Sequence, residues 1–172
     1  MRKQLLTPNS QSELSSQSPW LDLEAVANVE ITSEDADHPI ESALLGNREG
    51  GWVAATAGEQ TIRLTFPKPQ SLRRVRLEFA ETASARTQEF LLRSSADRGA
   101  SYRDVVRQQF HFSPPGTARQ VEDYNVELDG VTTLELIIVP DVQRGGARAS
   151  LGRLQLSSTP KPREQRASQD AS

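Results

Sequence analysis

Apolar and polar residues alternate along much of the central part of the chain. In residues 61–66 the side chains of Ile62, Leu64 and Phe66 fall on one face, and polar side chains fall on the other. Residues 73–79 repeat this pattern with Val75 and Leu77. Successive side chains of a β-strand point to opposite faces, so an alternation with a period of two residues is typical of strands with one buried face.

Eight segments are predicted to be strands, and turn-forming residues separate them. The segments are 26–32, 61–66, 73–79, 88–95, 102–112, 121–128, 132–140 and 149–156. A short helix is expected within 38–46, where Pro39 suits a first turn and Gly46 suits a stop. The sequence therefore predicts an all-β domain, an eight-stranded antiparallel β-sandwich with a jelly-roll topology.

Both ends of the chain differ in composition from its centre. Residues 7–19 are dominated by Ser, Gln and Pro, and residues 158–172 contain no large apolar side chain. Such segments bury too little surface to offset the entropy lost on ordering. We expect a disordered leader over 1–19, one domain over 20–157 and a disordered tail over 158–172.

The overall charge favours neither a nucleic-acid nor a membrane partner. The chain of 172 residues has 20 basic and 23 acidic side chains, a formal net charge of -3, and no cysteine. No secretory hydrophobic region follows the first residues and no apolar stretch is long enough to span a membrane. A cytoplasmic protein is expected, unless the chain is a segment of a larger one.

Catalytic patterns are missing from the sequence, so a binding protein is expected rather than an enzyme. There is no Gly-x-Ser-x-Gly motif, and the two histidines, His38 and His111, lie far apart. His111 is expected to point outward from a strand, so no zinc site is predicted. The adjacent Glu122 and Asp123 point to opposite faces of a strand, which is unsuitable for shared acid–base chemistry.

The order of these segments resembles the discoidin, or coagulation factor 5/8 type C, family of galactose-binding-like domains. A tryptophan, Trp52, precedes a strand that ends in a proline turn, and a closing strand of the Ala-x-Leu type follows near the end. The middle element, Ser-x-Asp-x-Gly-x-x-aromatic-x-x-Val, is matched by Ser95, Asp97, Gly99, Tyr102 and Val105. The resemblance implies a jelly roll that binds ligands through loops at one end.

The resemblance also suggests which polar residues form a ligand site. If the same loops cluster here, they bring together Asp35, His38, Arg86, Arg144 and Arg148. Arginine can donate two parallel hydrogen bonds to carboxylate, phosphate or sugar oxygens. Ordinary solvated loop charges are the alternative interpretation.

Trp52 belongs to the same candidate set, with two roles left open. In similar domains the equivalent tryptophan packs beneath the loops and closes the sandwich, although its ring can also stack on a ligand.

Calcium-containing members of the family use an Asp-Gly element before the tryptophan and a glutamate in the closing strand. Here Asn47 and Glu49 lie near the first position, and Arg153 stands where the glutamate is expected. A cation beside Arg153 would meet like charge, so no metal or other cofactor is predicted. A calcium ion would have to rely on Asn47, Glu49 and loop carbonyls.

Two functions follow from the resemblance. The first is a non-catalytic carbohydrate-binding module. The second is a protein-interaction or nicked-DNA-interaction module, because residues 52–62 also resemble the N-terminal domain of the single-strand-break repair scaffold. Nucleic-acid binding would use Arg63, Arg74 and Arg76, which are expected to form a small basic patch on neighbouring strands, although Glu78 and Glu89 interrupt it. The sequence does not indicate an oligomeric state.

Overall fold

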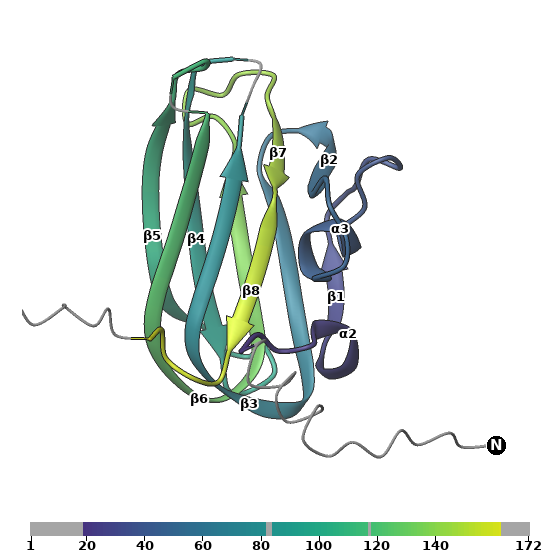
Figure 1. Cartoon of the computed structure of the whole chain (residues 1–172), viewed down its shortest axis with the longest axis vertical. Helices are drawn as coiled ribbons and strands as arrows, with labels where there is room; N and C mark the ends of the chain where they lie inside the picture. The colour runs from purple at the N-terminus through teal and green to yellow at the C-terminus, as the bar shows by residue number, and fades with distance from the viewer. Residues whose placement is uncertain (1–18, 82–83, 117, 163–172) are drawn as a thin grey trace, which may run out of the picture.

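A computed structural model describes residues 19–81, 84–116 and 118–162 of the chain. Its named strands pair in antiparallel fashion, and two short helices accompany them (Figure 1). In chain order the elements are α2 (Leu23–Val26), β1 (Asn28–Ile31), α3 (Glu41–Leu44), β2 (Trp52–Ala57), β3 (Gln60–Ala80), β4 (Arg86–Ser95), β5 (Arg103–Phe112), β6 (Arg119–Val139), β7 (Arg148–Leu151) and β8 (Arg153–Ser157). The predicted all-β antiparallel sandwich is confirmed.

The two longest strands, β3 and β6, each bend and contribute to both layers of the sandwich (Figure 1). The first half of β3 pairs with β1 and with the second half of β6, where Leu64 lies opposite Leu134. The second half of β3 pairs with β8 and with the first half of β6. The register shifts between Thr65 and Arg74 mark the bend. Strands β4 and β5 then extend the first layer beside β6.

The bends explain why the predicted strand boundaries differ from the observed ones. The predicted turn at 67–69 lies inside β3, and Gly130, with φ +64°, lies inside β6. Each of these two strands was predicted as two. The predicted segment 149–156 is instead divided into β7 and β8, and β2 was not predicted. The helix expected within 38–46 is α3.

Apolar side chains from both layers form one core. Ile62, Leu64 and Phe66 are each at most 1% exposed, as their alternation predicted. Aromatic rings join the layers, because Phe79 of β3 stacks on Phe90 of β4 with ring centroids 5.3 Å apart. Within the part of the chain that is described, neither helix has the length and apolar character needed to cross a membrane.

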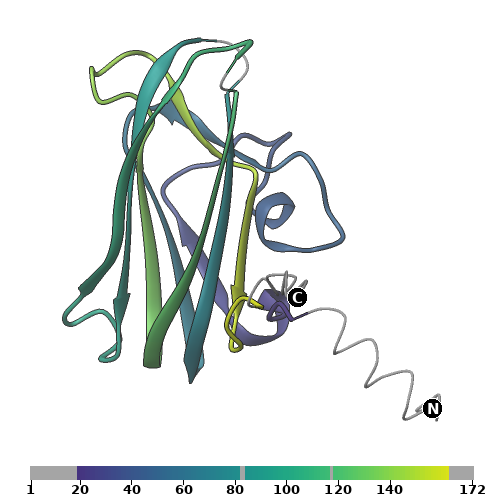
Figure 2. The ribbon, with the colours of Figure 1, turned by 60° about the vertical axis from the view of Figure 1, so that its left-hand side comes forward.

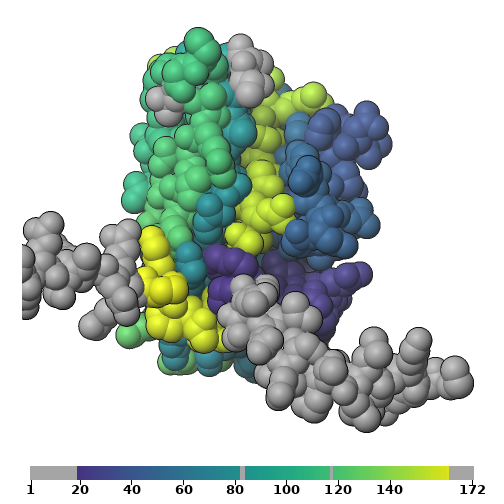
Figure 3. Space-filling model, in the orientation of Figure 1, coloured from purple at the N-terminus to yellow at the C-terminus, as the bar shows by residue number. Residues whose placement is uncertain are grey.

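The helices and the segment before β2 lie on one side of the strand layers (Figure 2). In the space-filling view, the blue segment that holds α3 and β2 lies against the yellow-green column of β7 and β8 (Figure 3). This packing places the loops that precede β2 beside those that flank β7.

The turn between β4 and β5 carries the Ser-x-Asp-x-Gly element. The Ser95 hydroxyl donates to Asp97 at 2.6 Å and accepts the Gly99 N–H at 2.8 Å. The Ser101 hydroxyl and N–H also donate to the Asp97 carboxylate. Hydrogen bonds from Ser101 and Ser95 lower the pKa of Asp97 to about 2. The element therefore stabilises a turn, which explains the spacing of its polar residues.

Candidate functional site

A cavity of about 450 Å³ lies at the end of the sandwich where β2 pairs with β7. Small residues form part of its wall, and polar side chains from three separate segments border it. The polar residues are His38, Glu81, Ser84, Arg148 and Ser150. The lining combines residues of β2, β3 and β7 with residues of the adjoining loops. The cavity is therefore a concave site of mixed polar and apolar character at this end of the sandwich.

Two of the candidate residues, His38 and Arg148, border this cavity, and Asp35 joins them through a contact with Arg148. The Arg148 guanidinium donates to Asp35 Oδ2 at 3.3 Å and to the Ala54 carbonyl oxygen at 3.4 Å. His38 Nδ1 lies 4.0 Å from the same Asp35 oxygen, too far for a hydrogen bond. Short backbone bonds to Val53 hold the segment in place, since Asp35 N donates to its carbonyl and Val53 N donates to that of His38. Residues separated by more than 100 positions thus form one group.

The charges of this group are arranged to keep Asp35 ionised. The Asp37 backbone N–H donates to Asp35 at 2.9 Å and is the main cause that lowers the pKa of Asp35, helped by His38 and Arg148. Both Arg148 contacts use the nitrogen Nη1, and its side chain remains 49% exposed. The site therefore offers a fixed carboxylate acceptor and an arginine that can still donate to a ligand.

Trp52 borders the cavity but is fully buried. Its indole N–H donates to the Ser33 carbonyl oxygen at 3.0 Å. The ring has no open face for a ligand in this structure, so the packing role holds and the stacking role does not. Trp52 supports the strand from which the site is built.

Arg86 was predicted to contact a ligand, but it is only 4% exposed. Its guanidinium donates to Glu81 at 2.6 Å and to the carbonyl oxygen of Pro140. These contacts tie the start of β4 to the segment after β6. Arg86 thus positions Glu81, which borders the cavity, and is not itself presented to a ligand.

Arg144 does not join the group either. It has a left-handed backbone conformation with φ +60°, and its N–H donates to the Asp141 carbonyl oxygen at 3.0 Å. It is exposed and does not border the cavity. Sequence reasoning missed Glu81, Ser84 and Ser150, because no motif marks residues that come from separate segments and meet only after folding.

The residues present do not fit a calcium ion in the loop before Trp52. Arg153 donates to the carbonyl oxygens of Leu45 and Arg48, at 2.9 and 2.7 Å. The guanidinium therefore uses the oxygens that a cation would need. Among the described residues, no group of three or more His, Cys, Asp or Glu side chains is arranged to hold a metal.

The expected basic patch of Arg63, Arg74 and Arg76 is not formed. Arg63 belongs to the first half of β3, whereas Arg74 and Arg76 belong to the second half, beyond the bend and in the other layer. Each is also paired with a carboxylate, as Arg74 is with Asp123 through two hydrogen bonds of 2.9 and 2.8 Å. The bend and the pairing remove the main support for phosphate binding.

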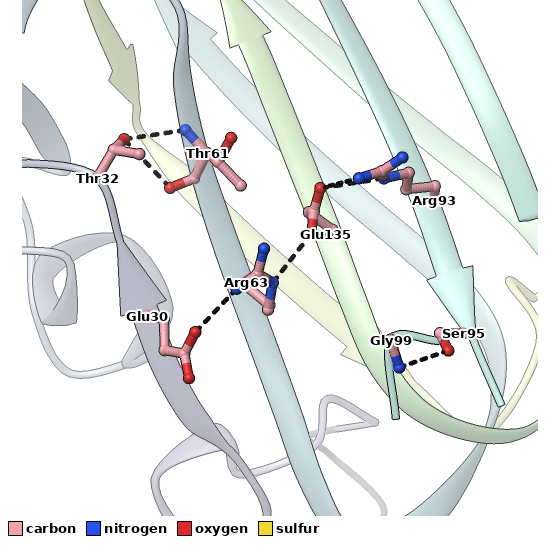
Figure 4. Close-up of polar contacts among 8 residues, drawn as sticks. All are labelled: Glu30, Thr32, Thr61, Arg63, Arg93, Ser95, Gly99 and Glu135. Atoms are coloured by element: carbon pink, nitrogen blue, oxygen red, sulfur yellow. Dashed lines mark hydrogen bonds and ion pairs between the residues drawn. The ribbon is translucent and has the colours of Figure 1, made fainter. Parts of the chain in front are cut away.

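Arg63 instead belongs to a charged cluster centred on a buried carboxylate (Figure 4). Glu135, only 2% exposed, accepts from Arg63 at 2.9 Å and from Arg93 at 3.0 and 2.6 Å. Arg63 also pairs with Glu30. Burial would raise the pKa of Glu135, but hydrogen bonds from Arg93 and Arg63 outweigh it and lower the pKa. This cluster lies across β1, β3, β6 and β4 and joins these strands.

The F5/8 type C domain model matches residues 25–146. The chain belongs to the F5/8 type C family. This confirms the resemblance found in the sequence. The match spans both sides of the bend in β3 and all of the strands from β1 to β6.

Solved structures with the same fold include carbohydrate-binding modules that were solved with a sugar. The family 32 carbohydrate-binding module of Clostridium perfringens NanJ, solved with galactose, is 14% identical with a TM-score of 0.59, covering 80% of this chain and 97% of that one. The family 32 module of AlyQ, solved with 4,5-unsaturated mannuronic acid, is 16% identical with a TM-score of 0.59, and the alignment covers 81% of this chain and 98% of the AlyQ module. XRCC1 bound to the DNA polymerase β catalytic domain is 19% identical with a TM-score of 0.54, covering 76% and 94%.

At these identities the likeness concerns the fold. The comparison with curated proteins found no match.

Proposed function

We propose that this chain is a non-catalytic carbohydrate-binding module that holds a sugar in the cavity beside Asp35, His38 and Arg148. The observation that supports the proposal most is that His38 and Arg148 border one concave site and that Asp35 contacts Arg148 there. Sugar hydroxyls both donate and accept hydrogen bonds, and the site supplies both functions. The sugar complexes of the NanJ and AlyQ modules, which share the fold, point to the same ligand class.

The chemistry of the cavity favours recognition by hydrogen bonds rather than by ring stacking. Trp52 is buried, and the other wall residues are mostly small, including Gly50, Ala80 and Ala147. Nδ1 of His38 is buried, although the side chain as a whole is partly exposed. A ligand can therefore reach the other edge of the imidazole ring, which carries Nε2. Arg148 supplies the charged donors. We therefore expect selectivity for the position of hydroxyl groups rather than for an apolar sugar face.

A glycan array with matched arginine variants tests this proposal. The unmodified domain and Arg148→Ala should be compared with Arg144→Ala, which removes an exposed arginine outside the cavity. Loss of a charge-assisted hydrogen bond of about 1.5–3 kcal/mol should weaken binding at least ~10-fold in Arg148→Ala. Arg144→Ala should bind like the unmodified domain. Equal binding by all three would contradict the proposed site.

The second candidate function is interaction with a protein or with nicked DNA, and the experiment must distinguish it from sugar binding. The XRCC1 likeness provides its support, since that domain is bound to a polymerase. If the unmodified domain binds no glycan on a broad array, and a cooperative thermal unfolding transition shows that it is folded, the carbohydrate proposal is rejected. Salt-sensitive binding to nicked duplex DNA would then point to phosphate contacts. Silence in both assays would favour a protein partner.

A further inference from the structure

One side chain ties the loop before β2 to the start of β8. The loop spans residues 45–51, between α3 and β2. Arg153 donates from Nη1 to the Leu45 carbonyl oxygen at 2.9 Å and from Nη2 to that of Arg48 at 2.7 Å. Both partners are neutral backbone carbonyls rather than carboxylates. The positive charge is therefore met by carbonyl dipoles, which is how a loop meets a bound cation.

The first residue of the loop is also the residue at which α3 ends. Leu45 follows α3 as its C-cap residue, and its carbonyl oxygen also accepts the Arg48 N–H at 3.2 Å. Carbonyls at the end of a helix lack partners within the helix, and a basic side chain commonly satisfies them. Arg153 does so from a strand that is remote in sequence. It thus fixes both ends of the turn formed by residues 45–48.

The end of the loop lies directly against the last residue of β7. Gly51 has φ +68°, and a side-chain carbon placed there would come within 2.6 Å of the Leu151 carbonyl oxygen. Gly50 and Gly152, on either side of this contact, both border the proposed sugar cavity. The Arg153 contacts therefore hold the loop whose last residues reach the cavity, and Arg153 itself directly follows Gly152 in the chain.

We infer that Arg153 takes the place of a structural cation in this loop, so that this member of the family needs no calcium to hold it. A divalent ion among the same carbonyls would meet the charge of Arg153, and the loop would offer it side-chain oxygens only from the exposed Asn47 and Glu49. The inference goes beyond sugar binding, because it concerns the stability of the loop and can be read without a ligand.

The first test uses the unmodified full chain. Its thermal unfolding midpoint should be the same with excess CaCl₂ and with EGTA, because ligands that bind only the folded state raise the midpoint. Calorimetric titration with CaCl₂ should show no binding. A midpoint that rises with calcium, or a saturable calcium titration, would overturn the inference, and neither measurement requires a variant to fold.

Variants at Arg153 form the second test. Arg153→Met keeps an unbranched apolar side chain similar to the aliphatic part of arginine but removes both donors, and it should lower the midpoint by about 5 °C. Arg144→Ala, an exposed arginine of another loop, should leave it unchanged. Arg153→Glu supplies an oxygen ligand beside the same carbonyls, so its midpoint should be low in EGTA and should rise with calcium.

Two results would contradict the replacement of a cation by Arg153. One is an Arg153→Met midpoint equal to that of the unmodified chain. The other is an Arg153→Glu variant that responds to calcium no more than the unmodified chain does. Both readouts are independent of carbohydrate binding, so failure of this inference and failure of the proposed function can be told apart.

Discussion

Glu135 is expected to be the charged residue whose neutralisation destabilises this fold most. The substitution Glu135→Gln keeps the shape of the side chain and removes its charge. In the folded protein this carboxylate is 2% exposed and accepts three hydrogen bonds from Arg63 and Arg93. Its partners come from β3 and β4, the strands on either side of β6. The substitution therefore weakens contacts that join three strands.

The expected loss follows from the exposure of the partners. Removing one member of a fully buried ion pair costs about 3–5 kcal/mol, because the other charge stays buried and unpaired. Here Arg63 and Arg93 are 39% and 31% exposed, so water can solvate them once the carboxylate is gone. Glutamine also keeps one acceptor oxygen. We expect a loss of about 2 kcal/mol, or a fall of about 4–8 °C in the unfolding midpoint for a domain of this size.

Urea and thermal unfolding of matched variants measure this loss. The control is Glu89→Gln, which removes the charge from an ion pair of 3.2 Å with Arg107, whose side chain is 58% exposed. Exposed pairs contribute little, so the control should change stability by less than about 0.5 kcal/mol. Equal effects of the two substitutions would refute the reasoning, because the contribution of a carboxylate to the free energy of unfolding would then not depend on its burial.

Two further predictions concern acid stability and the loop beside the cavity. Because folding lowers the pKa of Asp97 from 3.8 to about 2, its contribution is fully present above about pH 4 and is lost as the pH falls toward 2. Glu135, whose pKa is also lowered by folding, acts in the same direction, so midpoints measured across this range should fall, and should fall less in Asp97→Asn. Gly51→Ala should cost at least about 2 kcal/mol by urea unfolding, because of its positive φ and the close Leu151 carbonyl. A Gly51→Ala variant as stable as the unmodified chain would contradict the observed loop packing.

The period-two pattern was enough to predict the class of the fold and much of its core. Ile62, Leu64 and Val75 are buried as their alternation required. The bends in β3 and β6 could not be predicted, because prolines and glycines that usually mark turns here lie within continuous strands. Strand β2 was missed because Ala54, Ala55 and Ala57 carry little strand signal.

The candidate site was only partly predictable for a related reason. Asp35 and Arg148 do come into contact, with His38 beside them, since the fold brings β7 and the segment before α3 together at one end of the sandwich. The burial of Arg86 was not visible in the sequence, because it depends on Glu81 and on a carbonyl that lies 54 residues away in the chain. Pattern analysis assigns a side chain to a face but does not show what covers that face.

The central claim, that the loop-end cavity binds a sugar, is tested most directly by an amide NMR titration of the ¹⁵N-labelled domain with galactose and with unsaturated uronate oligosaccharides. The account predicts saturable shift changes confined to the amides around Asp35, His38, Val53 and Arg148, with Arg148→Ala abolishing them. No change with either sugar class, or changes centred on another face of the sandwich, would contradict it.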